Sequence, residues 1–171
     1  MRLTQPITPS LWFDKNGEEA ANFYVAVFPN SKMGKISRYS EAGREFHGME
    51  PGTAMSITFT VNGQPFTAIN GGPVFKFTEA ISFQLMCETQ EEVDYFWDKL
   101  SAGGDPKSQR CGWLKDRFGV SWQVVPRQLN DLIGGPDPAG AKRAMEAMLR
   151  QTKLDVGELE RAYRGELTAA R

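Results

Sequence analysis

The chain has 171 residues, of which 40% are hydrophobic and 24% charged, which is enough for one domain with a sizeable buried core. Its formal net charge of -1 gives no basic surface for a phosphate backbone, so a nucleic-acid partner is disfavoured. No apolar run approaches the roughly 20 residues that span a bilayer, the first residues lack a secretory signal, and Cys87 and Cys111 form no CxxC pair, so we expect a cytoplasmic protein without a membrane partner.

The first half of the chain is predicted to form a strand, a helix and then three strands. Asn16 is a typical helix-capping residue, and apolar side chains at helical spacing follow it as far as Val27. Apolar and polar residues alternate from Met55 to Val61, which indicates a strand with one buried face, and Asn62-Gly63 is a strong hairpin signal. The predicted strands cover 7–13, 35–39, 55–61 and 66–70, with the helix between the first two.

The second half repeats this order in a shorter form. Thr89 stands 73 residues after Asn16 and opens a helical stripe with the same spacing. We expect a strand over 81–87, a helix over 90–100 and strands near 106–109, 111–115 and 120–125. The hairpin glycines of the two halves, Gly63 and Gly119, are only 56 residues apart, so the first half carries 17 extra residues (73 less 56). The polar loop 41–52 is the obvious place for them and is a candidate lid.

The end of the chain is predicted to be helical. Beyond Gly134-Gly135-Pro136 the composition changes to Ala, Met, Lys, Arg and Glu, with an apolar stripe at helical spacing up to Leu149. Asp155 followed by Glu158 marks a second helix start. A helical tail over 136–171 is too short to hold a core of its own. We therefore expect it to dock on the main domain or on a second subunit.

Several local motifs point to one superfamily. They are Thr8-Pro9-x-Leu11-Trp12-Phe13-Asp14, Glu18-Glu19-Ala20, Phe23-Tyr24, Phe28-Pro29-Asn30-Ser31, Asn70-Gly71-Gly72-Pro73 and Cys111-Gly112-Trp113-Leu114-x-Asp116-x-Phe118-Gly119-Val120-Ser121-Trp122-Gln123. Together with the two strand-helix-three-strand halves, they resemble the vicinal oxygen chelate superfamily of glyoxalase I, extradiol dioxygenases and bleomycin resistance proteins. Within it they resemble the PhnB-like branch, which is often named 3-demethylubiquinone-9 3-methyltransferase. The resemblance covers about residues 5–128.

The resemblance implies an α+β fold with two glyoxalase-like βαβββ modules and a C-terminal helical tail. We expect the paired domain over 1–135, with modules at about 5–75 and 78–130, and the tail over 136–171. We also expect a homodimer. Because duplicated halves usually build a binding site where they meet, a small-molecule ligand is expected in the cavity between the modules.

The same resemblance allows a test for a metal. Superfamily enzymes typically hold a divalent metal with four side chains, His, Glu or Gln, from strands of both modules. Strand 7–13 contains none of these residue types, and strand 81–87 offers only Gln84. The matching positions on the two hairpin-closing strands are Thr67 and Gln123. Two neutral amides do not make a conventional site, so we expect neither a metal nor another cofactor.

The candidate ligand-binding residues are aromatic or uncharged hydrogen-bonding groups on the predicted strands, with the single histidine of the candidate lid. They are Trp12, His47, Thr67, Asn70, Gln84, Trp113 and Gln123. The two tryptophans could stack on a planar ligand, and the histidine could act as a general base. The alternatives remain that the tryptophans pack internally, the amides pair with each other, and the histidine is a solvated loop residue.

The resulting interpretation is a metal-independent small-molecule-binding protein. One alternative is a metal-dependent lyase, isomerase or dioxygenase of the same superfamily, and another is sequestration of a toxic compound without turnover. A methyltransferase is disfavoured, because the chain has no GxG turn of the kind that holds S-adenosylmethionine. Cys111 is either a nucleophile or a buried structural thiol. No catalytic residue is assigned, and the residues leave open whether the protein is an enzyme.

Overall fold

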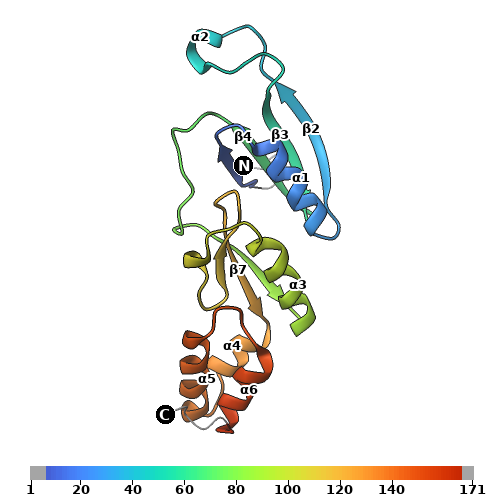
Figure 1. Ribbon diagram of the computed structural model, residues 1–171. Helices are drawn as coiled ribbons and strands as arrows, with labels where there is room; N and C mark the ends of the chain where they lie inside the picture. Colours follow the sequence, from blue (N-terminus) through green and yellow to red (C-terminus); the bar gives the residue numbers. More distant parts are fainter. Residues whose placement is uncertain (1–6, 167–171) are drawn as a thin grey trace, which may run out of the picture. The chain divides into compact units, whose positions relative to one another are not determined.

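A computed structural model describes residues 7–166 of the chain. The chain forms two compact units, Met1–Phe77 and Thr78–Arg171, and each holds one β-sheet (Figure 1). Helices and strands occur in both, so the fold class is α+β, as predicted. In the part of the chain that the structure describes, no helix is long and apolar enough to cross a membrane.

The first unit is the predicted strand-helix-three-strand module. Its elements are β1 (Ser10–Phe13), α1 (Gly17–Val27), β2 (Lys32–Arg38), α2 (Arg44–His47), β3 (Ala54–Val61) and β4 (Gln64–Asn70). The strands lie in the order β1-β4-β3-β2, with β1 parallel to β4 and the other pairs antiparallel. Asn62 and Gly63 form the hairpin between β3 and β4, and both take the positive φ that this tight turn requires.

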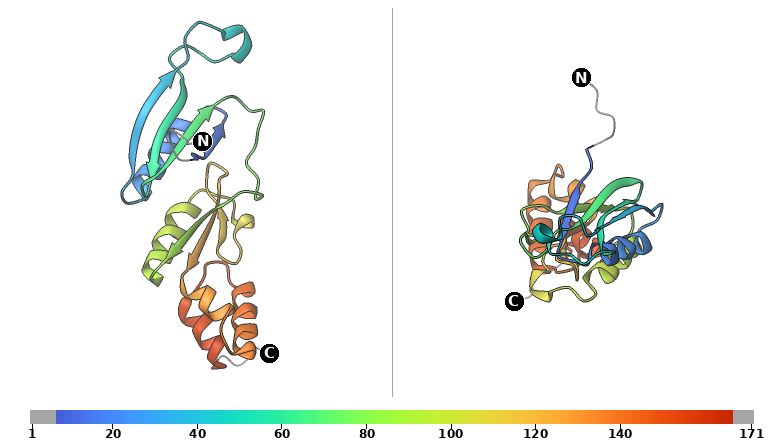
Figure 2. Two further views of the ribbon diagram at one scale, coloured as in Figure 1. Left: turned by 180° about the vertical axis from the view of Figure 1, so that it is seen from behind. Right: turned by 90° about the horizontal axis from the view of Figure 1, so that it is seen from above.

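Buried and more exposed side chains alternate along the strands of this sheet. The buried ones lie on the face that α1 covers, and the others lie on the open face. The face under α1 buries Leu11, Phe13, Ile57, Phe59, Phe66 and Ala68, together with Ala20, Tyr24 and Val27 of the helix. Burial of each large side chain stabilises the module by about 1.5–3 kcal/mol relative to exposure. Thr58 and Thr67 lie opposite each other on the other face. Figure 2 (left) views the unit from behind, with the sheet in front of α1.

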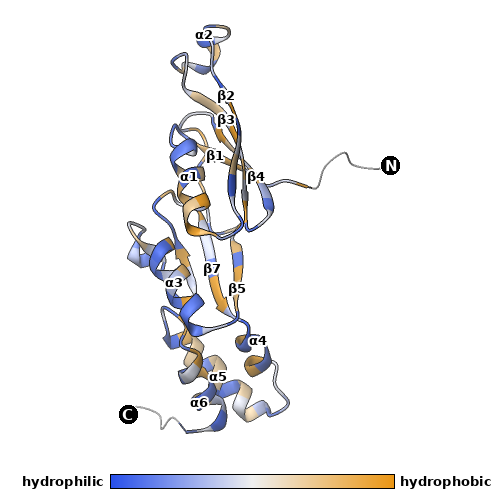
Figure 3. Cartoon of the chain, turned by 90° about the vertical axis from the view of Figure 1, so that its right-hand side faces the viewer, coloured by the Kyte–Doolittle hydropathy of each residue, from blue (hydrophilic) through white to orange (hydrophobic). Residues whose placement is uncertain are grey.

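The second unit begins with a shorter copy of the module. Its elements are β5 (Phe83–Cys87), α3 (Gln90–Ser101), the 3-10 helix η1 (Pro106–Ser108), β6 (Trp113–Lys115) and β7 (Ser121–Pro126). The strand order is β5-β7-β6, and β5 is parallel to β7 as β1 is to β4. Trp97 and Trp122 are both buried. Hydrophilic and hydrophobic residues are mixed along α1 and α3, as amphipathic helices require (Figure 3).

The prediction of a strand near 106–109 is wrong, because this segment turns into η1. Pro106 has no N–H to donate to a ladder, and the Asp105 carboxylate accepts the Lys107 N–H at 2.9 Å. The Ser108 hydroxyl then accepts the Lys115 N–H at 3.0 Å, and Arg110 forms a single bridge to Trp113. The loop therefore forms hydrogen bonds with backbone groups on the outer edge of β6, which would otherwise be unpaired.

The two helix starts use different caps. The Thr89 hydroxyl accepts the Glu92 N–H at 3.3 Å, as predicted. The prediction for Asn16 is wrong, because its side chain makes no cap bond. Instead, the side-chain oxygen of Asn70, 53 positions along the chain, accepts the Gly17 N–H at 2.8 Å. The cap comes from a neighbouring strand, which local spacing cannot reveal.

Three helices form the tail: α4 (Gln128–Ile133), which the sequence pattern missed, α5 (Pro138–Arg150) and α6 (Val156–Arg164). A buried cluster joins them to the end of β7, and it consists of Val125, Leu129, Ala147, Leu154, Leu159 and Ala162. Gln90 at the start of α3 also donates to the Leu154 carbonyl and accepts the Val156 N–H. The tail docks on the second module of its own chain, which is one of the two predicted alternatives.

Candidate functional site

The open face of the first sheet brings Trp12 and Thr67 together. In the register, Ser10 faces Thr67 and Trp12 faces Ile69 across the β1-β4 pair. Thr58 of β3 faces Thr67 from the other side. Because side chains alternate between the two faces of a sheet, all of these groups lie on the face opposite α1.

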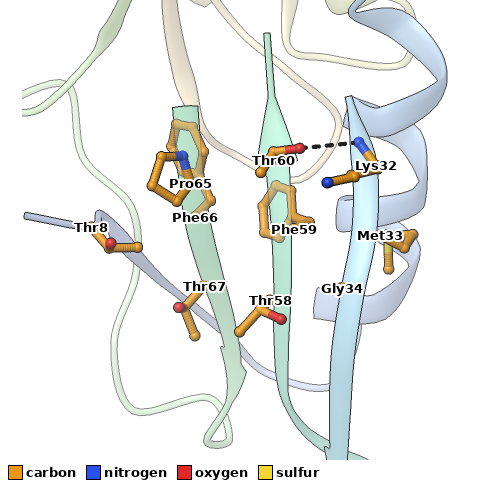
Figure 4. A pocket seen from close by; sticks show the side chains of 10 residues that line it. All are labelled: Thr8, Lys32, Met33, Gly34, Thr58, Phe59, Thr60, Pro65, Phe66 and Thr67. Carbon is orange, nitrogen blue, oxygen red and sulfur yellow. Dashed lines mark hydrogen bonds between the residues drawn. The ribbon is translucent and has the colours of Figure 1, made fainter. Parts of the chain in front are cut away.

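A hollow of about 300 Å³ lies over β2, β3 and β4 of this unit (Figure 4). Among the described residues its lining contains four threonines, Thr8, Thr58, Thr60 and Thr67, together with Met33, Gly34, Pro65 and one charged residue, Lys32. Phe59 and Phe66 also border it, but their side chains lie on the covered face. The volume is at the small end of the roughly 300–1,000 Å³ that ligand sites occupy, and the mixture of apolar walls with a few polar groups is typical of them. Of the predicted residues, only Thr67 lines this hollow.

Threonine hydroxyls hold the edge strand of the hollow in place. The Thr58 hydroxyl accepts the Lys35 N–H at 2.8 Å and donates to the Lys35 carbonyl at 3.2 Å. The Thr60 hydroxyl accepts the Lys32 N–H at 3.2 Å. These contacts bridge β3 to β2 where their register shifts between Met33 and Ile36. A Cβ at Gly34 would lie 2.5 Å from the Thr58 hydroxyl oxygen, so glycine allows the close approach.

Trp12 lies on the same face but is held by the segment after β4. Its indole N–H donates to the Gly72 carbonyl at 2.9 Å, and its ring packs edge-on against Phe75 at 5.0 Å between centroids. A Cβ at Gly71 would overlap the Trp12 ring, so this position requires glycine. The Asn70-Gly71-Gly72-Pro73 motif therefore runs across the tryptophan.

Asn70 is wholly buried, and its amide is used inside the module. Its side chain accepts the Gly17 N–H and donates to the Ala54 carbonyl at 2.9 Å. Its backbone carbonyl accepts the Tyr39 hydroxyl at 2.7 Å. The residue thus ties β4 to the start of α1 and to β3, and it presents no polar atom to the open face.

His47 is the last residue of α2, in the segment predicted as a lid. Its Nδ1 accepts the Met49 N–H at 3.0 Å, and its Nε2 lies 3.3 Å from the Ala42 carbonyl. Because Nδ1 accepts a hydrogen bond, the proton of the neutral ring belongs on Nε2. The ring also lies 4.4 Å from the Tyr39 ring between centroids. His47 therefore shapes its own loop, and it does not line the hollow.

The second sheet brings the other three predicted residues together in one row. Gln84, Gln123 and Trp113 are consecutive partners across β5, β7 and β6. The Gln84 amide donates to the Gln123 side-chain oxygen at 3.3 Å, and the Gln123 amide donates to the Ser82 hydroxyl at 2.7 Å. This Ser82-Gln123-Gln84 chain is a neutral hydrogen-bonded array beside an aromatic ring.

Sequence reasoning missed several groups near these residues. Ser82 precedes Gln84 by two positions on the same strand, and this period-two signal could have found it. Lys115 pairs with Glu79 at 2.5 Å, and the hydrogen bond from Lys115 lowers the pKa of the Glu79 carboxyl. Lys32 has no comparable sequence signal, because its place in the hollow depends on the register shift in β2.

Neither cysteine lines the hollow. Cys87 is buried at the end of β5, where burial, and to a lesser extent the Glu92 carboxylate, raises the pKa of its thiol to about 11. Cys111 is half-buried with a φ of 51°, and its N–H donates to the Gln151 carbonyl at 2.9 Å. Cys87 is therefore a protonated structural thiol at neutral pH.

The residues at the metal-binding positions of the superfamily do not fit a divalent metal. Ser10 occupies the β1 position that Gln84 occupies on β5, and Thr67 matches Gln123. All four side chains are neutral, and the Gln123 oxygen already accepts a hydrogen bond. Divalent metals are held in proteins mainly by carboxylates, imidazoles and thiolates, which amide oxygens supplement but do not replace. Within residues 7–166, no group of three or more His, Cys, Asp or Glu side chains could hold a metal.

The paired strand-helix units, each with its first strand parallel to its last, define a member of the vicinal oxygen chelate superfamily. A model of the 3-demethylubiquinone-9 3-methyltransferase family matches residues 5–125, and the chain belongs to this family. The match ends before the helical tail.

Solved structures agree with this assignment. A PhnB protein of Bacillus cereus, named for 3-demethylubiquinone-9 3-methyltransferase, is 41% identical, with a TM-score of 0.61 over 71% of this chain and 99% of that one. PA1353 of Pseudomonas aeruginosa is 21% identical, with a TM-score of 0.54 over 72% and 98% of the two chains, and shows the fold alone. Comparison with curated proteins gives no match.

Proposed function

We propose that this protein binds a small molecule on the open sheet face of its first module and needs no metal to do so. The hollow over β2, β3 and β4 is the observation that carries the proposal. Its lining combines Met33 and Pro65 with four threonines, so it can contact an apolar body and orient polar groups at its rim. Thr67, one of these threonines, lies between Ser10 and Thr58 in the register.

The neutral donor set supports metal independence. The Gln84 amide donates to the Gln123 oxygen, and the Gln123 amide donates to the Ser82 hydroxyl. A metal ion would have to break these hydrogen bonds, and it would find no negatively charged ligand among these side chains. The test is metal content by mass spectrometry after dialysis against nickel, zinc and manganese, with melting temperature measured in EDTA. We expect far less than one equivalent and an unchanged melting temperature. About one equivalent of bound metal, with a loss of stability in EDTA, would support a metal-dependent lyase, isomerase or dioxygenase instead.

Ligand binding is tested by following backbone amide NMR signals during a screen of small aromatic and aliphatic fragments. We expect the fragments that bind to shift the signals of residues 58, 60 and 67. Thr67→Met should fill the hollow and abolish these shifts, whereas Thr78→Met, at an exposed position outside the hollow, should not. Absence of shifts with every fragment would overturn the proposal. Shifts that persist in Thr67→Met would place the binding site elsewhere.

The family name suggests a methyltransferase, but the architecture supports this less well. S-adenosylmethionine usually sits at the carboxyl ends of the parallel strands of a Rossmann-like sheet. Each sheet described in this chain contains only one parallel pair. Isothermal titration with S-adenosylmethionine discriminates the two functions, and a micromolar Kd would favour the transferase.

The proposal includes a homodimer as the working form of the protein. Light scattering behind size exclusion should give twice the mass of one chain. A ligand that binds stoichiometrically and is recovered unchanged would favour sequestration, whereas a new product would show an enzyme.

A further inference from the structure

We infer that the ligand of the hollow carries an anionic group, and that Lys32 binds this group. The inference rests on the proposed function, because it concerns the same site. It begins from the ionisable groups in the lining. Among the residues that the structure describes, Lys32 is the only ionisable group in the lining, and no carboxylate lines it.

Two carboxylates elsewhere in the first unit pair with other cations. Glu18 pairs with Arg38 at 3.3 Å, and Glu50 pairs with Arg44 at 2.6 Å. In the described residues, Lys32 takes part in no ion pair. Lys32 is exposed, and its ammonium group can take a counter-ion through a charge-assisted hydrogen bond. A bound anion would supply that counter-ion.

The backbone contacts of Lys32 define where its side chain starts. The Lys32 N–H donates to the Thr60 hydroxyl oxygen, which anchors the residue at the end of β2. Figure 4 shows the lysine side chain extending from β2 toward β3, with its nitrogen on the side of Thr60. Because the Thr60 oxygen accepts that bond, its own O–H hydrogen is available to an anion next to the ammonium group.

A second hollow continues from the first at this end. It has a volume of about 290 Å³, and Lys32 and Thr60 line both. Asn30, Ser31 and Gly63 complete the second one, which holds no acidic side chain. The cation thus stands between a mainly hydroxyl and amide-lined space and the apolar wall at Pro65.

These two surfaces define the class of ligand. The apolar wall accommodates a short aryl or alkyl body, and the Lys32-Thr60 pair accommodates its charged end. Both a carboxylate and a phosphate monoester meet this description, because each offers oxygen acceptors to an ammonium and a hydroxyl. The shared chemistry is a small amphiphilic anion.

Matched probes test the inference. The first pair is 3-phenylpropionate with 3-phenylpropionamide, and the second is phenyl phosphate with phenol. Binding to the full chain is followed by the NMR signals of residues 58, 60 and 67, at low and at high salt. We expect the anion of at least one pair to bind about fivefold more tightly than its neutral partner, and added salt to reduce this preference. The pair with the larger preference identifies the head group.

Lys32→Met should abolish the preference for the anion while the neutral partner still binds. Lys35→Met is the matched control, because Lys35 lies on the same strand but outside the lining, and it should keep the preference. Both variants retain the backbone N–H groups that contact Thr60 and Thr58. Equal binding of anion and neutral partner, or a preference that survives in Lys32→Met, would overturn the inference but leave the proposed function intact. If no probe shifts any of these signals, both are overturned.

Discussion

The side-chain oxygen of Asn70 accepts the backbone N–H of Gly17 at 2.8 Å. The last strand of the first module therefore caps the helix that follows its first strand. Gly17 has no room for a side chain at this contact, since a Cβ there would lie 2.7 Å from the same oxygen. The contact fixes α1 against one face of the sheet, and α1 does not cover the other face.

Asn70→Ala should destabilise the first module by about 2–4 kcal/mol, because it leaves the buried Gly17 N–H and Ala54 carbonyl without partners. Urea denaturation measures the change. Asn22→Ala removes an amide that bonds the Glu18 carbonyl at an exposed site, and it should cost no more than about 0.5 kcal/mol. Equal effects of the two substitutions would show that Asn70 is not a structural cap.

Asp116 holds the last hairpin of the second module with a buried carboxylate. One oxygen accepts the Phe118 and Val120 N–H groups at 2.8 and 3.0 Å, and the other accepts the Trp122 indole N–H at 2.8 Å. Asp116→Ala should cost about 3 kcal/mol. Asp116→Asn should also destabilise, because its amide would place a donor against a donor. Chemical denaturation followed by tryptophan fluorescence gives both values, and a neutral Asp116→Asn substitution would contradict this account.

Gln90 links the tail to the second module through both ends of its amide. Gln90→Ala should free the Leu154 carbonyl and the Val156 N–H, and weaken docking of the tail by about 1–2 kcal/mol. Hydrogen exchange should then speed up over 150–166 while β3 and β4 of the first unit stay protected. Gln109→Ala, at a residue that contacts neither group, is the control. Unchanged exchange in the tail would show that the apolar cluster alone holds it.

The Cys87 thiol should make stability depend on alkaline pH. Its pKa rises from 9.0 to about 11 in the folded chain, so the unfolded chain loses its proton first as pH increases. Folding is therefore unaffected by this group below about pH 9, and the free energy of unfolding falls between pH 9 and 11. Cys87→Ala should reduce this decrease in the free energy of unfolding, whereas Cys111→Ala should not. In native protein at pH 8, a disulfide reagent should react with Cys111 faster than with Cys87, and the reverse order would contradict the burial.

Local patterns predicted those elements whose signals lie within a few residues. Thr89 and Glu92 are three positions apart, and the cap formed as expected. The alternation from Met55 to Val61 separated the covered face from the open one. The three residues Gln84, Gln123 and Trp113 were predicted one by one, and only the registers of β5, β7 and β6 place them in one row.

Other features depend on contacts between distant parts of the chain. Asn70 looked like a ligand group, yet the Gly17 N–H, 53 positions away, takes its oxygen. The segment at 106–109 looked like a strand, yet Pro106 and the Asp105 carboxylate turn it into η1. Lys32 looked like an ordinary surface lysine, yet the register shift between β2 and β3 places it in the hollow.

The sequence by itself determined the α+β class, the duplicated strand-helix units and the neutral residues at the metal-binding positions, because periodicity and residue type are local properties. The tertiary structure alone decided which polar groups are used inside the fold. Asn70 and Asp116 take complementary partners, and strand register and helix docking decide which partners are within reach.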